Sequence, residues 1–139
     1  MDGKILIVDD NEDVLFALNL LLEPYVEKIK VTTSPARIEY FMDNFNPDII
    51  LLDMKLSPDP SSAQEAYLGP EKILQKDPQA VVLFITAYAD TEKAVKAIRA
   101  GAIDFIPKPW ETEKLLATIS SAIRLRQTRT EAVALKEQL

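Results

Sequence analysis

Five polar residues, each at the end of an apolar run, have side chains that together could handle a phosphoryl group. Asp9 and Asp10 follow one run, Asp53 follows a second, Thr86 a third and Lys108 a fourth. Clustered carboxylates raise one another's pKa unless a cation lies among them. Mg²⁺ suits such a cluster because it takes one or two carboxylates and leaves positions for phosphate oxygens. With a lysine charge and a threonine hydroxyl added, the set is typical of a site that attaches a phosphoryl group to a carboxylate.

Three of these residues also have a purely structural explanation. Asp53 alone could cap a helix at the end of a strand, Asp9 could cap the first helix, and Thr86 could satisfy a loop. Lys108 stands between two prolines, where a role in the core is improbable. The occurrence of all five residues in register favours the phosphoryl site over these separate explanations.

The elements that must position these residues alternate along the chain. Short apolar runs with little polar alternation predict buried strands over residues 4–8, 29–33, 49–52, 80–85 and 103–106. Helical patterns separate and follow them: from Asn11 to a stop at Pro24, over 35–45, around 71–76, over 91–100 and from 111 or 112 onward. Ser34 and Pro35 are predicted to open the second helix, and Gly101 to end the fourth. Five alternations in 139 residues predict a doubly wound α/β sheet, because a barrel needs about 250 residues.

The composition excludes several classes of function. The chain has no cysteine and no histidine, so disulfides, thiolate sites and imidazole catalysis are excluded, and any metal must have oxygen ligands. The net charge of −6 argues against nucleic-acid binding by this segment. No apolar run approaches the roughly 20 residues of a membrane helix, and the start lacks the regions of a signal peptide. We therefore expect a cytoplasmic protein.

Four segments carry a resemblance to a known family. ILIVDDNEDV, DIILLDM, VVLFITAYAD and AGAIDFIPKPW resemble, in order and spacing, the receiver domain of two-component response regulators. The KPW ending and a long loop over residues 57–70 are similar to receivers of σ54-dependent (NtrC-type) transcription regulators. The resemblance covers residues 4 to about 123 and implies a flavodoxin-like parallel sheet with strand order 2-1-3-4-5.

By this resemblance, Asp53 is the phosphoacceptor. Asp9 and Asp10 organise Mg²⁺ together with Asp53 and the backbone carbonyl of Lys55. The phosphoryl group would come from a histidine of a partner sensor kinase, because this chain has none. The domain would catalyse only its own phosphorylation and dephosphorylation, and is otherwise not an enzyme.

The resemblance also assigns a switch. Thr86 is the hydroxyl that contacts the phosphoryl group, Lys108 is the lysine that pairs with it, and Phe105 is the aromatic that moves with Thr86. Phe105 could instead be an ordinary core residue. The family usually has a cis peptide bond at the position of Lys108–Pro109, so we expect one here.

Two departures of this sequence from the receiver pattern leave other functions open. The loop over 57–70 carries an insertion in which a short helix could form at 63–67, and Lys55 stands near the expected path of an attacking water. A pseudo-receiver that only binds partners is one alternative. An aspartyl-nucleophile phosphohydrolase of the haloacid dehalogenase class is another, but that class needs a second aspartate where Lys55 stands.

The last residues predict an assembly. We expect a receiver domain over 1–123 and, over 124–139, the start of a helical linker to a missing effector domain. Leu125, Thr128, Ala132, Leu135 and Leu139 form a weak heptad, which could be a coiled coil or a frayed surface helix. We expect a homodimer through the face of the fourth helix, fifth strand and fifth helix, extended by this tail, and no contact with nucleic acid or membrane.

Overall fold

The sheet at the centre of the molecule is parallel and five-stranded. The computed structural model describes residues 3–56, 69–86, 98–99 and 101–138. The strands are β1 (Lys4–Val8), β2 (Lys28–Thr32), β3 (Ile49–Asp53), β4 (Val81–Thr86) and β5 (Asp104–Pro107). They pair in the order β2-β1-β3-β4-β5, all in parallel. The predicted doubly wound α/β fold and its strand order are therefore confirmed.

Burial follows the position of each strand in the sheet. Every residue of β3 and β4 is buried, because these strands have neighbours on both sides and helices over both faces. The two edge strands are more exposed, and β2 carries the exposed Lys28 and Lys30. Lysines on an edge strand discourage pairing with another chain. Pro107 is tolerated in β5 because an edge strand does not need every N–H for the ladder.

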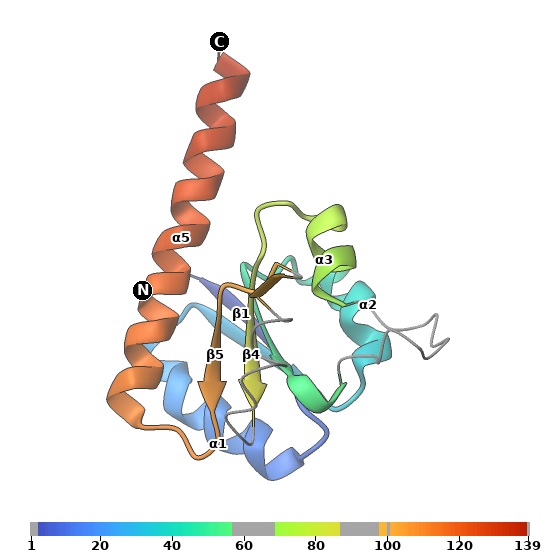
Figure 1. Cartoon of the computed structure of the whole chain (residues 1–139), viewed down its shortest axis with the longest axis vertical. Helices are drawn as coiled ribbons and strands as arrows, with labels where there is room; N and C mark the ends of the chain where they lie inside the picture. Colours follow the sequence, from blue (N-terminus) through green and yellow to red (C-terminus); the bar gives the residue numbers. More distant parts are fainter. Residues whose placement is uncertain (1–2, 57–68, 87–97, 100, 139) are drawn as a thin grey trace.

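Helices cover the two faces of the sheet. They are α1 (Glu12–Leu22), α2 (Ile38–Asn44), α3 (Pro70–Lys76) and α5 (Thr112–Gln138). One core cluster joins α1 and α5 to alternate strand residues such as Ile5 and Leu51, and a second joins α2 and α3 to the intervening ones such as Leu6 and Leu52. Figure 1 shows α1 and α5 on one side of the sheet and α2 and α3 on the other. The strands are thus held from both sides, which fixes where their carboxyl ends lie.

The start of α1 agrees with the sequence prediction. Asn11 is its N-cap, and its side-chain oxygen accepts the backbone N–H groups of Asp13 at 2.9 Å and Val14 at 3.4 Å. The α-helix ends at Leu22 and passes into a 3-10 turn, η1 (Glu23–Tyr25), that contains Pro24. The cap places the first turn of α1 directly after the two aspartates that follow β1.

The prediction for the second helix is wrong in its first turn. Ser34 makes no side-chain capping bond, and residues Pro35–Arg37 form a 3-10 turn, η2, before α2 begins at Ile38. The backbone N–H of Arg37 donates to the carbonyl of Ser34 at 3.1 Å, which closes the tighter turn. The predicted strand limits at β2, β4 and β5 are each shifted by one residue, a usual uncertainty for element ends.

Gly101 lies at the position predicted for the end of the fourth helix. Its φ of 111° is in the left-handed region, and its N–H donates to the carbonyl of Ile98 at 3.1 Å. A side chain here would also meet Leu74. The rest of the helix predicted over 91–100 lies outside the described residues, as do the predicted loop and short helix over 57–68.

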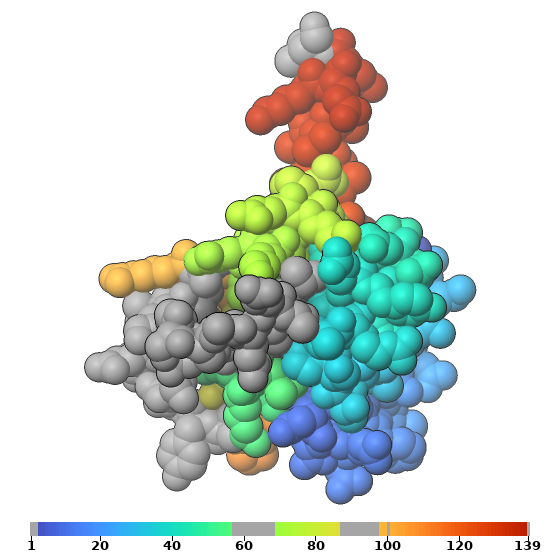
Figure 2. Space-filling view, turned by 90° about the vertical axis from the view of Figure 1, so that its right-hand side faces the viewer, coloured from blue at the N-terminus to red at the C-terminus, as the bar shows by residue number. Residues whose placement is uncertain are grey.

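Helix α5 is long and only its first half is packed. Its buried residues are Leu115, Ile119, Ala122 and Ile123, and beyond them the helix continues without a break to Gln138. Its end stands clear of the rest of the molecule (Figures 1 and 2). Among the described helices, none combines the length and the apolar character needed to cross a membrane.

Candidate functional site

The predicted site residues lie at one edge of the sheet, where four strands end. Asp53 is the last residue of β3 and Thr86 the last of β4, while Asp9 follows β1 and Lys108 follows β5. The pairing of Asp53 with Ile85, and of Thr86 with Pro107, sets these ends side by side. A parallel sheet brings all carboxyl ends to one edge, and open α/β sheets bind ligands there.

Three carboxylates meet at this edge. One oxygen each of Asp9, Asp10 and Asp53 lie within 4.8 Å of one another. Asp9 and Asp53 are fully buried, whereas Asp10 is exposed. The cluster is therefore closed on the protein side and open to solvent at Asp10.

Lys108 supplies a positive charge inside this cluster. Its Nζ donates to Asp9 Oδ2 at 2.7 Å and lies 3.6 Å from Asp53 Oδ2, and its side chain is only 16% exposed. The backbone N–H of Lys108 donates to the carbonyl of Thr86 at 2.6 Å, which ties the lysine to the end of β4. The peptide bond between Lys108 and Pro109 is cis.

Asp9 is held by a second contact that the sequence analysis missed. Its Oδ1 accepts the backbone N–H of Asn11 at 2.9 Å, while Oδ2 accepts Lys108. An aspartate that accepts the N–H two residues on is a common turn arrangement, and the asparagine at a predicted helix start was the available signal. With both oxygens occupied, Asp9 positions Lys108 as much as it faces the centre of the cluster.

Asp53 has one oxygen with a hydrogen bond and one oxygen without. Oδ1 accepts the backbone N–H of Lys55 at 3.1 Å, whereas the buried Oδ2 has no hydrogen-bond partner among the described residues. Burial raises the pKa of Asp53 above its ordinary value, the Lys55 N–H lowers it, nearby Asp9 raises it and Lys108 lowers it, with a net upward direction. A buried acceptor without a hydrogen bond is costly, and the ammonium of Lys108 lies 3.6 Å away, so this oxygen is a place for chemistry or for a cation.

Thr86 and Phe105 lie on the same face of the sheet. Phe105 pairs with Phe84, and Thr86 is two residues after Phe84 on the same strand, so the alternation of side chains directs all three to one side. Thr86 is 6% exposed, and Phe105 is half-buried against the core cluster under α2 and α3. The two predicted switch residues are therefore neighbours on adjacent strands.

The oxygen set fits a magnesium ion. Asp9, Asp10 and Asp53 each offer a carboxylate oxygen, and the close spacing of these oxygens suits the hard oxygen ligands that Mg²⁺ prefers. Lys55 lies in the 3-10 turn η3 (Met54–Leu56) that follows β3, and its side chain is exposed. The edge of the doubly wound sheet thus carries an acidic trio and a buried lysine.

Residues 5–120 match the family described as the response regulator receiver domain. This chain belongs to that family. The receiver domain is 34% identical over 140 residues to the response regulator protein PilR of Pseudomonas aeruginosa, an alignment that covers 98% of this chain and 29% of PilR. It is 32% identical to the response regulator protein TmoT of Ectopseudomonas mendocina, covering 94% of this chain and 57% of TmoT.

A third relative is the phosphoglycerate transport system transcriptional regulatory protein PgtA of Salmonella typhimurium, 33% identical over 90% of this chain and 29% of PgtA. The receiver domain thus spans less than two thirds of the length of these relatives.

Solved structures show the same fold. The N-terminal signal receiver domain of a two-component system response regulator from Bacteroides fragilis superposes with a TM-score of 0.74 at 36% identity, covering 88% of this chain and 97% of that one. NtrX from Brucella abortus, in complex with ADP, gives a TM-score of 0.81 over 98% of this chain and 29% of that one, and at 24% identity it supports the fold alone.

Proposed function

We propose that this receiver domain is a phosphorylation switch in which Asp53 accepts the phosphoryl group from a sensor histidine kinase. The observation that carries the proposal is the buried Oδ2 of Asp53, without a hydrogen bond among the described residues and 3.6 Å from the ammonium of Lys108. A phosphoryl oxygen placed on Asp53 would meet this cation. Lys108 is already held by Asp9, so it needs no large rearrangement to act.

The transfer forms one bond and breaks one. A carboxylate oxygen of Asp53 attacks the phosphorus of a phosphohistidine, the phosphorus–nitrogen bond breaks, and the imidazole leaves with the bonding electron pair and takes up a proton. The product is an acyl phosphate on Asp53. Oδ2 is the candidate nucleophile, because Oδ1 accepts the N–H of Lys55. Positioning and charge stabilisation supply most of the catalysis in such transfers.

Asp10 and Asp53, with Asp9 and the Lys55 carbonyl, are the residues that would hold Mg²⁺. When bound, the ion neutralises the charge that gathers on the phosphoryl oxygens. Asp9 contributes chiefly by holding Lys108, since its two oxygens already accept Lys108 and the N–H of Asn11. The exposed Asp10 marks the side from which the ion and the phosphodonor can approach.

Phosphorylation would be converted into a change of surface through Thr86 and Phe105. The added charge of about −1.5 to −2 attracts hydroxyl and ammonium groups. Thr86 then moves toward the phosphoryl oxygens and leaves space on the face where Phe105 lies. Phe105, which is half-buried, then moves inward into the space that Thr86 leaves.

The output is altered self-association or effector activity in a transcription regulator. PgtA, one of the relatives, is a transcriptional regulatory protein by name, and the alignment with this chain covers 29% of its length. The expected dimer face includes the fourth helix, most of which lies outside the described residues, together with β5 and α5. We therefore include in the proposal a sensor kinase as partner, a homodimer as the assembly and regulation of transcription as the outcome.

Intact-mass measurement tests the proposal. Treatment with acetyl phosphate and Mg²⁺ should add about 80 Da to the wild-type chain and nothing to Asp53→Asn. Asp13→Asn, which removes an exposed carboxylate from the nearby start of α1, is the matched control and should be labelled like wild type. Labelling of Asp53→Asn at full stoichiometry would refute Asp53 as acceptor, and an unlabelled wild-type chain would favour the pseudo-receiver alternative.

A further inference from the structure

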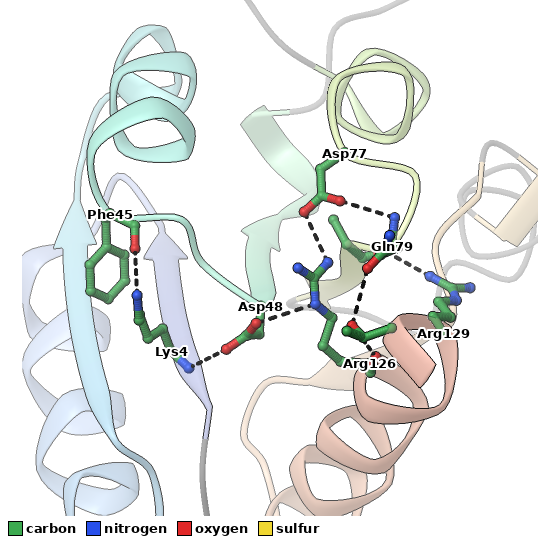
Figure 3. Close-up of polar contacts among 9 residues, drawn as sticks. Lys4, Phe45, Asp48, Asp77, Gln79, Arg126 and Arg129 are labelled. Carbon is green, nitrogen blue, oxygen red and sulfur yellow. Dashed lines mark hydrogen bonds and ion pairs between the residues drawn. The ribbon is translucent and has the colours of Figure 1, made fainter. Parts of the chain in front are cut away.

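A second polar cluster lies at the opposite edge of the sheet, where the strands begin. Arg126, on the part of α5 beyond its last buried residue, reaches back to this edge (Figure 3). Its Nε lies 3.2 Å from Asp48 Oδ1, just before β3, and its Nη1 lies 2.9 Å from Asp77 Oδ2, just before β4. One guanidinium therefore bridges the starts of the two central strands.

The two aspartates are themselves fixed. Asp48 Oδ2 accepts the backbone N–H of Lys4, the first residue of β1, at 2.9 Å, and Asp77 Oδ1 accepts the N–H of Gln79 at 3.1 Å. All four carboxylate oxygens thus have partners. The Arg126 side chain is 19% exposed and both aspartate side chains are 30% exposed, so solvent screens these pairs less than surface pairs. Arginine suits the position because its planar fork can donate to two carboxylates at once.

The next turn of α5 adds two further contacts. Arg129 Nη1 donates to the carbonyl of Ala80 at 2.7 Å, and Thr130 Oγ1 donates to Gln79 Oε1 at 3.1 Å. Leu125 packs against the core cluster under α1 and α5. The first residue of the predicted heptad is therefore committed to the domain, and Leu135, at 63% exposed, is the first large apolar residue of the heptad that stands free.

We propose that Arg126 is a positioning residue that makes α5 a rigid part of the receiver as far as Thr130 and fixes the direction in which the helix leaves the domain. We name the contacts of Arg126, Arg129 and Thr130 with the strand starts the α5 clasp. It is anchored to β1, β3 and β4, the strands whose other ends lead to Asp9, Asp53 and Thr86. Whatever follows the helix is thus oriented relative to the same three strands that carry the acidic site.

Without the clasp, little would hold this part of the helix. The buried apolar residues of α5 end at Ile123, and a short unsupported helical segment is marginal in water. Motion of the helix would then begin just after Leu125, the last residue that packs on the core, instead of beyond Thr130. The proposal does not depend on phosphorylation of Asp53, because the clasp lies at the other edge of the sheet.

Two readouts on the full chain test the clasp. The chain has no cysteine, so Lys72→Cys on α3 and Ala132→Cys on α5, both exposed, give unique sites for a pair of spin labels. Dilution with unlabelled chain removes distances between copies. Amide hydrogen exchange of residues 127–131 gives the second readout. Arg124→Ala is the matched control, because it removes the same charge from an exposed position of the same helix.

We expect Arg126→Ala to broaden the distance distribution and to speed exchange of the 127–131 amides at least about tenfold, whereas Arg124→Ala changes neither. Arg126→Lys keeps the charge but loses the planar guanidinium. Its effects on both readouts should lie between those of Arg126→Ala and those of Arg124→Ala. Unchanged exchange of the β3 and β4 amides verifies that each variant is folded. If Arg126→Ala does not fold, Asp77→Asn takes its place and should give the same changes to a smaller degree. The proposal is overturned if the folded variants match Arg124→Ala in both readouts.

Discussion

The ammonium of Lys108 donates a 2.7 Å hydrogen bond to the buried carboxylate of Asp9, joining two side chains that are 99 residues apart in the sequence. This pair closes the base of the acidic cluster, and Asp53 Oδ2 lies 3.6 Å from the same ammonium. The arrangement has consequences for stability, metal binding and assembly that can be measured separately.

Removal of the buried lysine should destabilise the domain. We expect Lys108→Ala to lower the free energy of unfolding at pH 7 by about 3 kcal/mol, because it leaves two buried carboxylates without a cation. Urea denaturation measures the change, and added Mg²⁺ should recover part of it. The control is Lys114→Ala, which removes an exposed lysine that pairs with Glu111 at 3.7 Å. It should lower the free energy of unfolding by less than about 1 kcal/mol. Equal losses in the two variants would contradict the buried pairing.

Neutralising Asp53 should stabilise the metal-free domain. Burial raises the pKa of Asp53 above its ordinary value of 3.8, so protonated Asp53 contributes stability that is fully present below that value and is lost as the pH rises through the raised pKa. At pH 7 in EDTA, Asp53→Asn should therefore be more stable than wild type by on the order of 1 kcal/mol. Urea titrations from pH 4 to pH 7 should show the difference growing with pH. A difference that shrank with rising pH would have the wrong sign for this explanation.

Magnesium binding should depend on the carboxylate of Asp10. Asp10 is the exposed member of the trio, and its carboxylate is the accessible ligand beside Asp53. We expect Asp10→Asn to weaken Mg²⁺ binding at least about tenfold, a loss comparable to removal of one charged ligand interaction. Isothermal titration calorimetry measures it directly, and quenching of the half-buried Trp110 gives a second signal. Asp13→Asn is the charge-matched control, and equal affinities in all three chains would remove Asp10 from the site.

Self-association should depend on the free end of α5. Because Leu125 packs on the domain core, the seam left for a second copy is Thr128, Ala132, Leu135 and Leu139, which is poor in apolar residues. We expect the tail alone to be too weak, and phosphorylation of the domain to strengthen the dimer. Sedimentation of the full chain, of Leu135→Ala and of a chain shortened after Glu131, each with and without beryllofluoride, separates the contributions. Monomers in every sample at high concentration would exclude the dimer while leaving the phosphoacceptor proposal intact.

Local patterns in the sequence determined the elements and the candidate site. Apolar runs of strand length predicted all five strands to within a residue, and the polar residues at their ends pointed to one edge, because parallel strands must bring their carboxyl ends together. The acidic trio and Lys108 are recognisable for the same reason. Within the part of the chain that the structure describes, the first turn of the second helix was misjudged, where the Arg37 N–H to Ser34 carbonyl bond selects a 3-10 turn over a capped α-helix.

Tertiary structure decided which of the site's oxygens are occupied and where the last helix is tied. That Asp9 uses both oxygens while Asp53 Oδ2 has no hydrogen bond in the described chain depends on distances between strand ends that no spacing encodes. Arg126 and Asp77 are 49 residues apart in unrelated elements, and each alone looks like an ordinary surface charge. They meet because the sheet brings the strand starts to a common edge and α5 packs antiparallel across it. A pairing made by packing and not by local periodicity can be seen only once the chain is folded.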